Sequence, residues 1–425
     1  MTAHSTPTWR HPLVLSPLVA IGLLAISLVI LAGASFVNPA PRLKAAFASG
    51  TLLADEAAHR AWEKLGRFRP DCEIAGTLVL KDQKFDRYLF APQVPKDADG
   101  VLGTCQVVRD LSYGSAPQNV GSRPLGDNPV LLRATSRLAL VIAPMQAWLI
   151  VQPLVVLLIW AGTVFLLHRH RQMTPAAVAL MTAASLVAAG FAALTLTLGL
   201  AAWLWPLSVA AALLTPRRVA WVLPAISAAL GALSALMAHE SALTLSVLLS
   251  LTFGLSVRGL KWRELGENAL AFVIAACVVT LLLAFANVLN RHLGGVAALQ
   301  YVVAQFTDGA VFLTQNADAV IARSVDRVGK RLADYNGWLG FGLYLMLVAI
   351  LFGGWATLLR SYRVTGMLVL LSLAVLVLWF ELMLDRVSAQ PMQFVSLLLL
   401  LFVYSLAALI AACLPRRATP LEVVT

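Results

Sequence analysis

The 425-residue chain is 60% hydrophobic and only 12% charged, and its net charge is +11. Soluble domains carry about 45–50% apolar and about 25% charged residues, so this composition excludes an ordinary water-soluble protein and favours a bundle of membrane-spanning helices. The cationic residues occur in twos and threes between apolar runs and form no basic face, which argues against nucleic-acid binding.

The apolar runs predict an all-α polytopic membrane protein with ten spans. The first run, Leu13–Val37, is longer than the apolar core of a signal peptide and ends in a poor cleavage site, so we expect a retained signal anchor. Two of the further crossings must fit into a single apolar stretch between Pro175 and Thr215. The nine further spans are expected near residues 140–168, 176–196, 198–214, 219–237, 241–257, 268–289, 337–359, 364–384 and 394–413.

Basic residues predict the orientation of these spans. They cluster at both ends of the chain and on alternate turns, at Arg10, Arg169/Arg171, Arg217/Arg218, Arg258/Lys261/Arg263, Arg360/Arg363 and Arg416/Arg417. The positive-inside rule therefore places both termini in the cytoplasm. Polar segments 38–137 and 290–336 are then extracytoplasmic, and the chain divides into segments 1–37, 38–137, 138–289, 290–336 and 337–425.

Cysteine positions agree with this orientation. Cys72 and Cys105 both lie in segment 38–137, outside the reducing cytoplasm, so we expect them to form a disulfide. A zinc site is less favoured because no histidine stands at ligand spacing beside either cysteine. Cys277 and Cys413 lie within apolar spans, where buried thiols are expected.

Segment 38–137 is expected to form a small disulfide-linked domain, either α or mixed α/β. Residues 42–68 have helical periodicity interrupted at Ser49-Gly50, which predicts two short helices. Residues 74–80 fit either a strand or the buried face of a helix. Pro, Gly, Asp and Asn predict loops over residues 91–103 and 114–129, and residues 131–141 are expected to form an interfacial helix.

Asp55 and Glu56 are the first candidates for a catalytic role, because they begin a helix just beyond the first span. A carboxylate at a helix N-terminus also stabilises that helix without any catalytic role. Alternatively, one carboxylate acts as a general base that takes a proton from an acceptor hydroxyl at the membrane surface. The residues themselves leave both interpretations open.

The arrangement resembles the GT-C class of polyprenyl-phosphate-sugar-dependent glycosyltransferases. The shared features are a retained first helix, a large first extracytoplasmic loop, an early acidic pair and many further spans. The motif of bacterial arabinose and aminoarabinose transferases is similar to Ala54-Asp55-Glu56-Ala57-Ala58-His59-Arg60-Ala61-Trp62-Glu63. The resemblance implies a bacterial inner-membrane enzyme in which an acid is the base and basic residues near the membrane hold the lipid phosphate.

Asp71 is the second candidate base, because it precedes Cys72 and a disulfide would hold it rigidly. An ordinary loop aspartate is the alternative interpretation, and we rank Asp55 first by its resemblance to the family motif. The chain has no second strong acidic motif in a later outer loop, which leaves dependence on a divalent metal open.

Other charged residues of the predicted outer face supply candidate partners. His239 and Glu240 occupy a short turn, and Asp385 and Arg386 a span end, where a cation could bind a lipid phosphate. Residues 306–336 have the pattern of an interfacial amphipathic helix. Either this helix is only a membrane-surface spacer, or its basic residues form a rim that attracts a donor phosphate or anionic lipid: Arg323, Arg327, Lys330 and Arg331.

The leading hypothesis is a glycosyltransferase that moves a sugar from a polyprenyl-phosphate donor to a glycan, lipid or protein acceptor outside the cytoplasm. A transporter or flippase for a lipid-linked glycan is the main alternative, and a non-catalytic scaffold of an envelope assembly system is the third. The sequence contains no Walker, dinucleotide-binding, His-Glu-x-x-His or Gly-x-Ser-x-Gly motif, which argues against nucleotide hydrolysis and metalloprotease chemistry.

Overall fold

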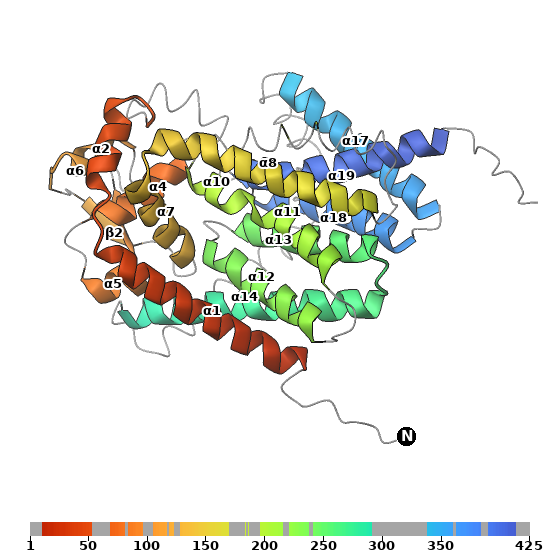
Figure 1. Cartoon of the computed structure of the whole chain (residues 1–425), viewed down its shortest axis with the longest axis horizontal. Coiled ribbons are helices and arrows are strands. Elements are labelled where there is room, and N and C mark those ends of the chain that lie inside the picture. The colour runs from red at the N-terminus through yellow and green to blue at the C-terminus, as the bar shows by residue number, and fades with distance from the viewer. Residues whose placement is uncertain are drawn as a thin grey trace, which may run out of the picture.

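The computed structural model is a bundle of long helices with shorter elements gathered at one end (Figure 1). Among the residues that the structure describes, three helices are long and apolar enough to cross a membrane, by length and composition: α1 (Pro12–Ser35), α8 (Met145–Arg169) and α14 (Trp262–Asn290). The structure describes residues 183 and 186 and the ranges 11–52, 69–80, 84–96, 105–116, 119–122, 128–169, 196–215, 221–237, 241–290, 338–359, 363–383 and 390–413.

The remaining bundle helices match most of the predicted spans, although the total of ten remains a prediction. The predicted span at 198–214 is divided at Trp203, and the predicted span at 176–196 lies almost entirely outside the described residues. The other bundle helices are α10 (Leu196–Ala202), α11 (Leu204–Leu214), α12 (Val222–Met237), α13 (Ser241–Val257), α17 (Trp338–Leu359), α18 (Arg363–Met383) and α19 (Gln390–Cys413).

Local sequence signals account for where helices begin and end. The His11 side chain accepts a hydrogen bond from Leu13 N at 3.4 Å, and Pro12 suits the first turn of α1. Asn38 Oδ1 accepts from Ala40 N at 3.0 Å where the next helix begins. At the start of α14, Glu264 Oε2 accepts from Lys261 N at 3.0 Å, which satisfies a backbone donor at this end.

The short elements at one end form what we call the disulfide cap, the described part of residues 40–122. β1 and β2 are antiparallel, and Gln93 pairs with Ser122 in their register. These strands correct the prediction that residues 91–103 and 114–129 are entirely loop. The cap contains α2 (Ala40–Ala48), α4 (Arg69–Val79), α5 (Phe85–Phe90), β1 (Gln93–Lys96), α6 (Cys105–Ser112) and β2 (Asn119–Ser122).

Helix formation in the cap follows the sequence pattern in two places. α2 ends before Gly50, whose φ of 71° is a conformation that favours glycine, so the predicted interruption is confirmed. The second helix predicted within 42–68 falls outside the described residues. Residues 74–80 are all buried, and 74–79 are helical, so the helical alternative is the one that forms.

α7 (Val130–Ile142) lies between two hydrophobic clusters and joins them. Leu132 and Leu140 belong to a cluster with cap residues and α8, whereas Val130 and Ala134 pack in a second cluster with α1, α12 and α14. Eight of the thirteen α7 residues are buried. The predicted interfacial helix is therefore helical, but it packs inside the protein because apolar residues occupy more than one of its faces.

Cys277 differs from its predicted environment, because the α14 position that carries this free thiol is exposed rather than buried. α14 presents other large apolar side chains outward, including Val273 and Leu281. An apolar exposed face is what a helix in contact with lipid requires, so the helix was predicted correctly but the burial of Cys277 was not.

Close helix packing at Gly231 generates a stability prediction. A Cβ atom built there would lie 2.2 Å from the Phe272 carbonyl oxygen of α14. We expect Gly231→Ala to lower stability by about 1–3 kcal/mol, because two backbones must separate to admit one methyl group. Thermal unfolding in detergent measures this. Gly266→Ala is the control, since no atom lies within 4 Å of its Cβ position, and an equal loss in both variants would contradict the packing account.

Candidate functional site

The predicted disulfide between Cys72 and Cys105 is present and joins α4 to α6. Both cysteines are 1% exposed, and their Cα atoms are 5.1 Å apart. Asp71 immediately precedes Cys72 within α4, so the second candidate base stands on a crosslinked helix rather than in a loop. It also lies one helical turn before Ala75, a buried residue of the same helix.

The other predicted site residues lie outside the described residues, and their roles remain predictions. They comprise the first candidate base and its neighbour, the turn residues and the candidate phosphate-binding cations: Asp55, Glu56, His239, Glu240, Arg323, Arg327, Lys330, Arg331, Asp385 and Arg386. Among the described residues, no group of three or more His, Cys, Asp or Glu residues could hold a metal ion.

A buried arginine of α7 connects the disulfide cap to the first helix. Arg137 is 9% exposed, and its guanidinium donates hydrogen bonds to neutral oxygens from three segments. The acceptors are Val37 O at 2.6 Å, Ser35 O at 3.1 Å, the Tyr88 hydroxyl at 3.1 Å and Leu78 O at 3.4 Å. Within the described part of the chain, no acid forms an ion pair with Arg137.

A second arginine stands one turn earlier on the same face of α7. Arg133 is fully buried and donates to Asn128 Oδ1 at 2.9 Å and to the Tyr88 carbonyl oxygen. Asn128 in turn donates to Leu89 O at 3.0 Å. The Tyr88 ring lies 4.8 Å from the Arg133 guanidinium carbon and 5.5 Å from that of Arg137, so one aromatic ring contacts both cations.

Most acceptors in this arginine junction are backbone carbonyls at or just beyond the ends of three helices. Ser35 ends α1, Leu78 lies in the last turn of α4, and Tyr88 and Leu89 lie in the last turn of α5. The final four carbonyls of a helix lack partners within it, and a long helix carries roughly −0.5 charge at this end. The two arginines of α7 and the preceding Asn128 therefore satisfy these carbonyls, while the helix ends compensate for burial of two guanidinium groups.

Neither Arg133 nor Arg137 is among the residues that the sequence predicts for the site. The available signal is their i, i+4 spacing on an otherwise apolar helix, which puts two cations on one face. Their partners are backbone carbonyls up to 102 residues away in the sequence. Residue types and local spacing do not reveal such partners, because every residue has a carbonyl.

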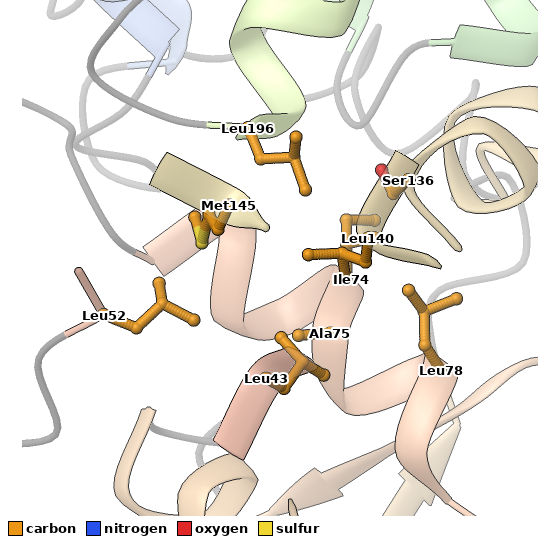
Figure 2. Close-up of a pocket in the computed structure, with 9 residues that line it drawn as sticks. All are labelled: Leu43, Leu52, Ile74, Ala75, Leu78, Ser136, Leu140, Met145 and Leu196. Atoms are coloured by element: carbon orange, nitrogen blue, oxygen red, sulfur yellow. The ribbon is translucent and has the colours of Figure 1, made fainter. Parts of the chain in front are cut away.

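Beside the arginine junction, an apolar pocket lies where the cap meets the bundle (Figure 2). The cavity is small, about 10 Å³, which is room for about one water molecule. All nine lining residues are buried, and Ser136 supplies the only hydroxyl among them. They come from the α2 region, α4, α7 and the beginnings of α8 and α10: Leu43, Leu52, Ile74, Ala75, Leu78, Ser136, Leu140, Met145 and Leu196.

Comparisons of the chain with protein-family models, curated proteins and solved structures find no match. The resemblance to GT-C glycosyltransferases therefore stays a hypothesis that rests on the sequence features given above.

The arginine junction predicts a large effect of Arg137→Met, which preserves side-chain bulk but removes every donor. We expect stability to fall by about 2–4 kcal/mol, because acceptors in Leu78 and Tyr88 lose buried partners. Thermal unfolding in detergent is the measurement. Arg263→Met is the control, since Arg263 forms an exposed i, i+4 pair with Glu267 and such pairs contribute about 0.3–0.5 kcal/mol. Similar melting temperatures for both variants would contradict a structural role for the junction.

The disulfide predicts a comparable loss when Cys72 and Cys105 are both replaced by Ser. Its 33-residue separation gives a stabilisation of about 3–4 kcal/mol in the chain-entropy model. We expect the double variant to melt at a lower temperature than the oxidised wild type, and a reductant to have no further effect on it. Identical melting of the oxidised wild type and the variant would show that the crosslink does not stabilise the cap.

Proposed function

We propose that this protein is a membrane glycosyltransferase that uses a polyprenyl-phosphate sugar and acts on the side of the membrane where the disulfide cap lies. The proposal includes a bacterial inner-membrane location, ten spans, cytoplasmic termini and a glycan, lipid or protein acceptor. Asp55 is the proposed general base and Asp71 the alternative. The cations of residues 323–331 and Arg386 are proposed to bind the donor phosphate.

The observation that carries the proposal is the position of α4. This helix bears Asp71, is crosslinked through Cys72, and lines the apolar pocket with Ile74 and Ala75. Near the end of the helix, the carbonyl of Leu78 accepts a hydrogen bond from Arg137. A helix that carries an acid is thus anchored where the cap meets the beginning of α8, a helix long enough to cross a membrane.

This placement suits transfer from a lipid-linked donor. The reaction needs a carboxylate that accepts the proton of the attacking hydroxyl, while the anomeric carbon loses its bond to the lipid phosphate. Cations stabilise the negative charge that develops on that departing phosphate. The base must be held at the boundary between membrane and water, because the donor chain stays in the bilayer while the acceptor approaches from outside it. The anchoring of α4 by its disulfide supports Asp71 as the alternative base in this proposal.

A transporter or flippase is the second candidate, and Asn287 of α14 favours it. Its side chain is fully buried, and neither amide atom has a hydrogen-bond partner among the described residues. Burying an amide without a partner is costly, and polar groups inside membrane helices often mark a transport pathway. In reconstituted vesicles, this candidate predicts that the wild type moves a labelled lipid-linked saccharide across the bilayer and that Asn287→Leu does not.

The glycosyltransferase proposal is tested by Asp55→Asn and Asp71→Asn, assayed separately with a labelled polyprenyl-phosphate sugar and acceptor candidates in nanodiscs. Loss of a general base lowers the transfer rate by about 10²- to 10⁴-fold, and we expect this loss in Asp55→Asn. Retained activity there with loss in Asp71→Asn would assign the base to α4.

Asp110→Asn is the matched control, because Asp110 lies in α6 of the same cap and forms a half-exposed ion pair with Arg109. We expect its transfer rate to equal that of the wild type. Full activity in both test variants, with each folded and inserted, would exclude both proposed bases. Absence of transfer by the wild type together with saccharide movement would favour the transporter.

A further inference from the structure

The short cap helix α5 lies beside the ends of two helices that are long and apolar enough to cross a membrane, α1 and α14 (Figure 1). The Tyr88 hydroxyl of α5 and the Ser35 carbonyl at the end of α1 both accept hydrogen bonds from the Arg137 guanidinium, each at 3.1 Å. Tyr88 and Leu89 also belong to the hydrophobic cluster that contains Leu283 of α14. One side of α5 is therefore fixed at the level where α1 ends.

This level corresponds to the edge of the apolar part of the bundle. The apolar run of α1 ends at Val37, before Asn38, and that of α14 ends at Leu289. Leu283 precedes Leu289 by about 9 Å along the helix, at about 1.5 Å per residue. The cluster that holds α5 consequently includes a part of α14 that is still apolar, so α5 lies at the depth where the membrane surface is expected.

Exposed aromatic rings and cations occur together at this level. Phe85, at the beginning of α5, is 54% exposed, and Phe36, at the end of α1, is 89% exposed. Lys84 is exposed beside Phe85, and Arg42 is exposed in α2, which follows the end of α1. Aromatic and basic residues in this combination are typical of helices that lie in the boundary between bilayer and water, where the rings enter the lipid and the cations reach its phosphates.

From this arrangement we infer that α5 is a membrane-interface anchor that binds an anionic phospholipid of the leaflet on the cap side. The two exposed phenylalanine rings insert between lipid headgroups, and the neighbouring cations bind the headgroup phosphates. A net anionic lipid is favoured because two cations of segment 84–87, Lys84 and Arg87, outnumber its one acid, Asp86. The anchor depends on α1 and α14 as membrane spans and does not depend on glycosyl transfer.

Site-directed spin labelling tests the depth of α5. Cys277 and Cys413 are replaced by Ala, which leaves the disulfide intact, and one label is attached at Phe85→Cys in the full chain. The protein is placed in nanodiscs of mixed phosphatidylcholine and phosphatidylglycerol. Power-saturation EPR then measures how often the label collides with oxygen, which concentrates in the bilayer, and with a nickel complex that stays in water. We expect oxygen collisions to predominate.

Two further labels bracket this result. Tyr113→Cys is the matched control within the cap, because Tyr113 is 50% exposed but follows α6, which lies at the outer edge of the cap in Figure 1. Phe285→Cys is the bilayer reference, because Phe285 is 49% exposed on the apolar helix α14. The ratio of oxygen to nickel collisions for Phe85→Cys should lie well above that of Tyr113→Cys and approach that of Phe285→Cys.

Photocrosslinking tests the choice of headgroup. Phosphatidylglycerol and phosphatidylcholine that carry the same photoreactive group near the headgroup are compared in the same nanodiscs, and labelled peptides are mapped. We expect the anionic lipid to label α5 more strongly, and Lys84→Gln to reduce that preference about five-fold, the effect of one cation near an anionic surface. Lys44→Gln is the matched control, because Lys44 is also exposed in the cap but its ammonium lies over the Tyr113 ring, 4.6 Å from the centroid.

A collision ratio for Phe85→Cys equal to that of Tyr113→Cys would overturn the inference, because α5 would then lie in water. Low collision rates with both reagents would also overturn it, because protein rather than lipid would then cover Phe85. Equal labelling of α5 by the two lipids, or an unchanged preference in Lys84→Gln, would overturn the assignment of an anionic headgroup. If Phe85→Cys fails to insert, a label at Asp86→Cys, which is also exposed on α5, provides the same measurement.

Discussion

Burial of two guanidinium groups against helix ends is the constraint on which the rest of this structure depends. Arg133 and Arg137 project from α7 toward carbonyls at the ends of α1, α4 and α5. A buried cation without compensation would be strongly destabilising, and so would unpaired carbonyls at buried helix ends. The carbonyls offset the cost of burying the two guanidinium groups, and the guanidinium groups supply the donors that the carbonyls lack. The arrangement joins the ends of three helices, and it attaches the disulfide cap to the bundle through hydrogen bonds as well as apolar contacts.

The same junction lies beside α4, which carries a candidate base and lines the apolar pocket. The α4 carbonyl that Arg137 binds belongs to Leu78, which also lines the pocket. The disulfide at Cys72 anchors the earlier part of α4, next to Asp71. One short helix is consequently fixed by a covalent bond toward its beginning and by an arginine near its end. Such fixing is what precise positioning of a reactive group requires, whichever chemistry the acid performs.

The sequence predicted what depends on composition and local pattern. Long apolar runs predicted the positions of the bundle helices. The expected extracytoplasmic location of Cys72 and Cys105 predicted their disulfide, and Gly50 predicted the end of α2. It did not predict β1 and β2, because strands of four residues carry too little periodicity to detect. The arginine junction and the pocket were also missed. Both bring together segments far apart in the chain. Most acceptors of the junction are backbone carbonyls, which every residue has and which residue identity therefore cannot reveal.

Hydrogen–deuterium exchange of Arg137→Met beside the wild type tests most directly whether the arginine junction attaches the cap to the bundle. The account predicts that amides of α4 and α5 lose protection selectively, because the carbonyls of Leu78 and the hydroxyl of Tyr88 lose their donor. Amides of α18 and α19, which belong to the bundle away from the junction, should keep wild-type protection. Unchanged exchange in α4 and α5, or an equal loss of protection in all four helices, would contradict the central role of the junction.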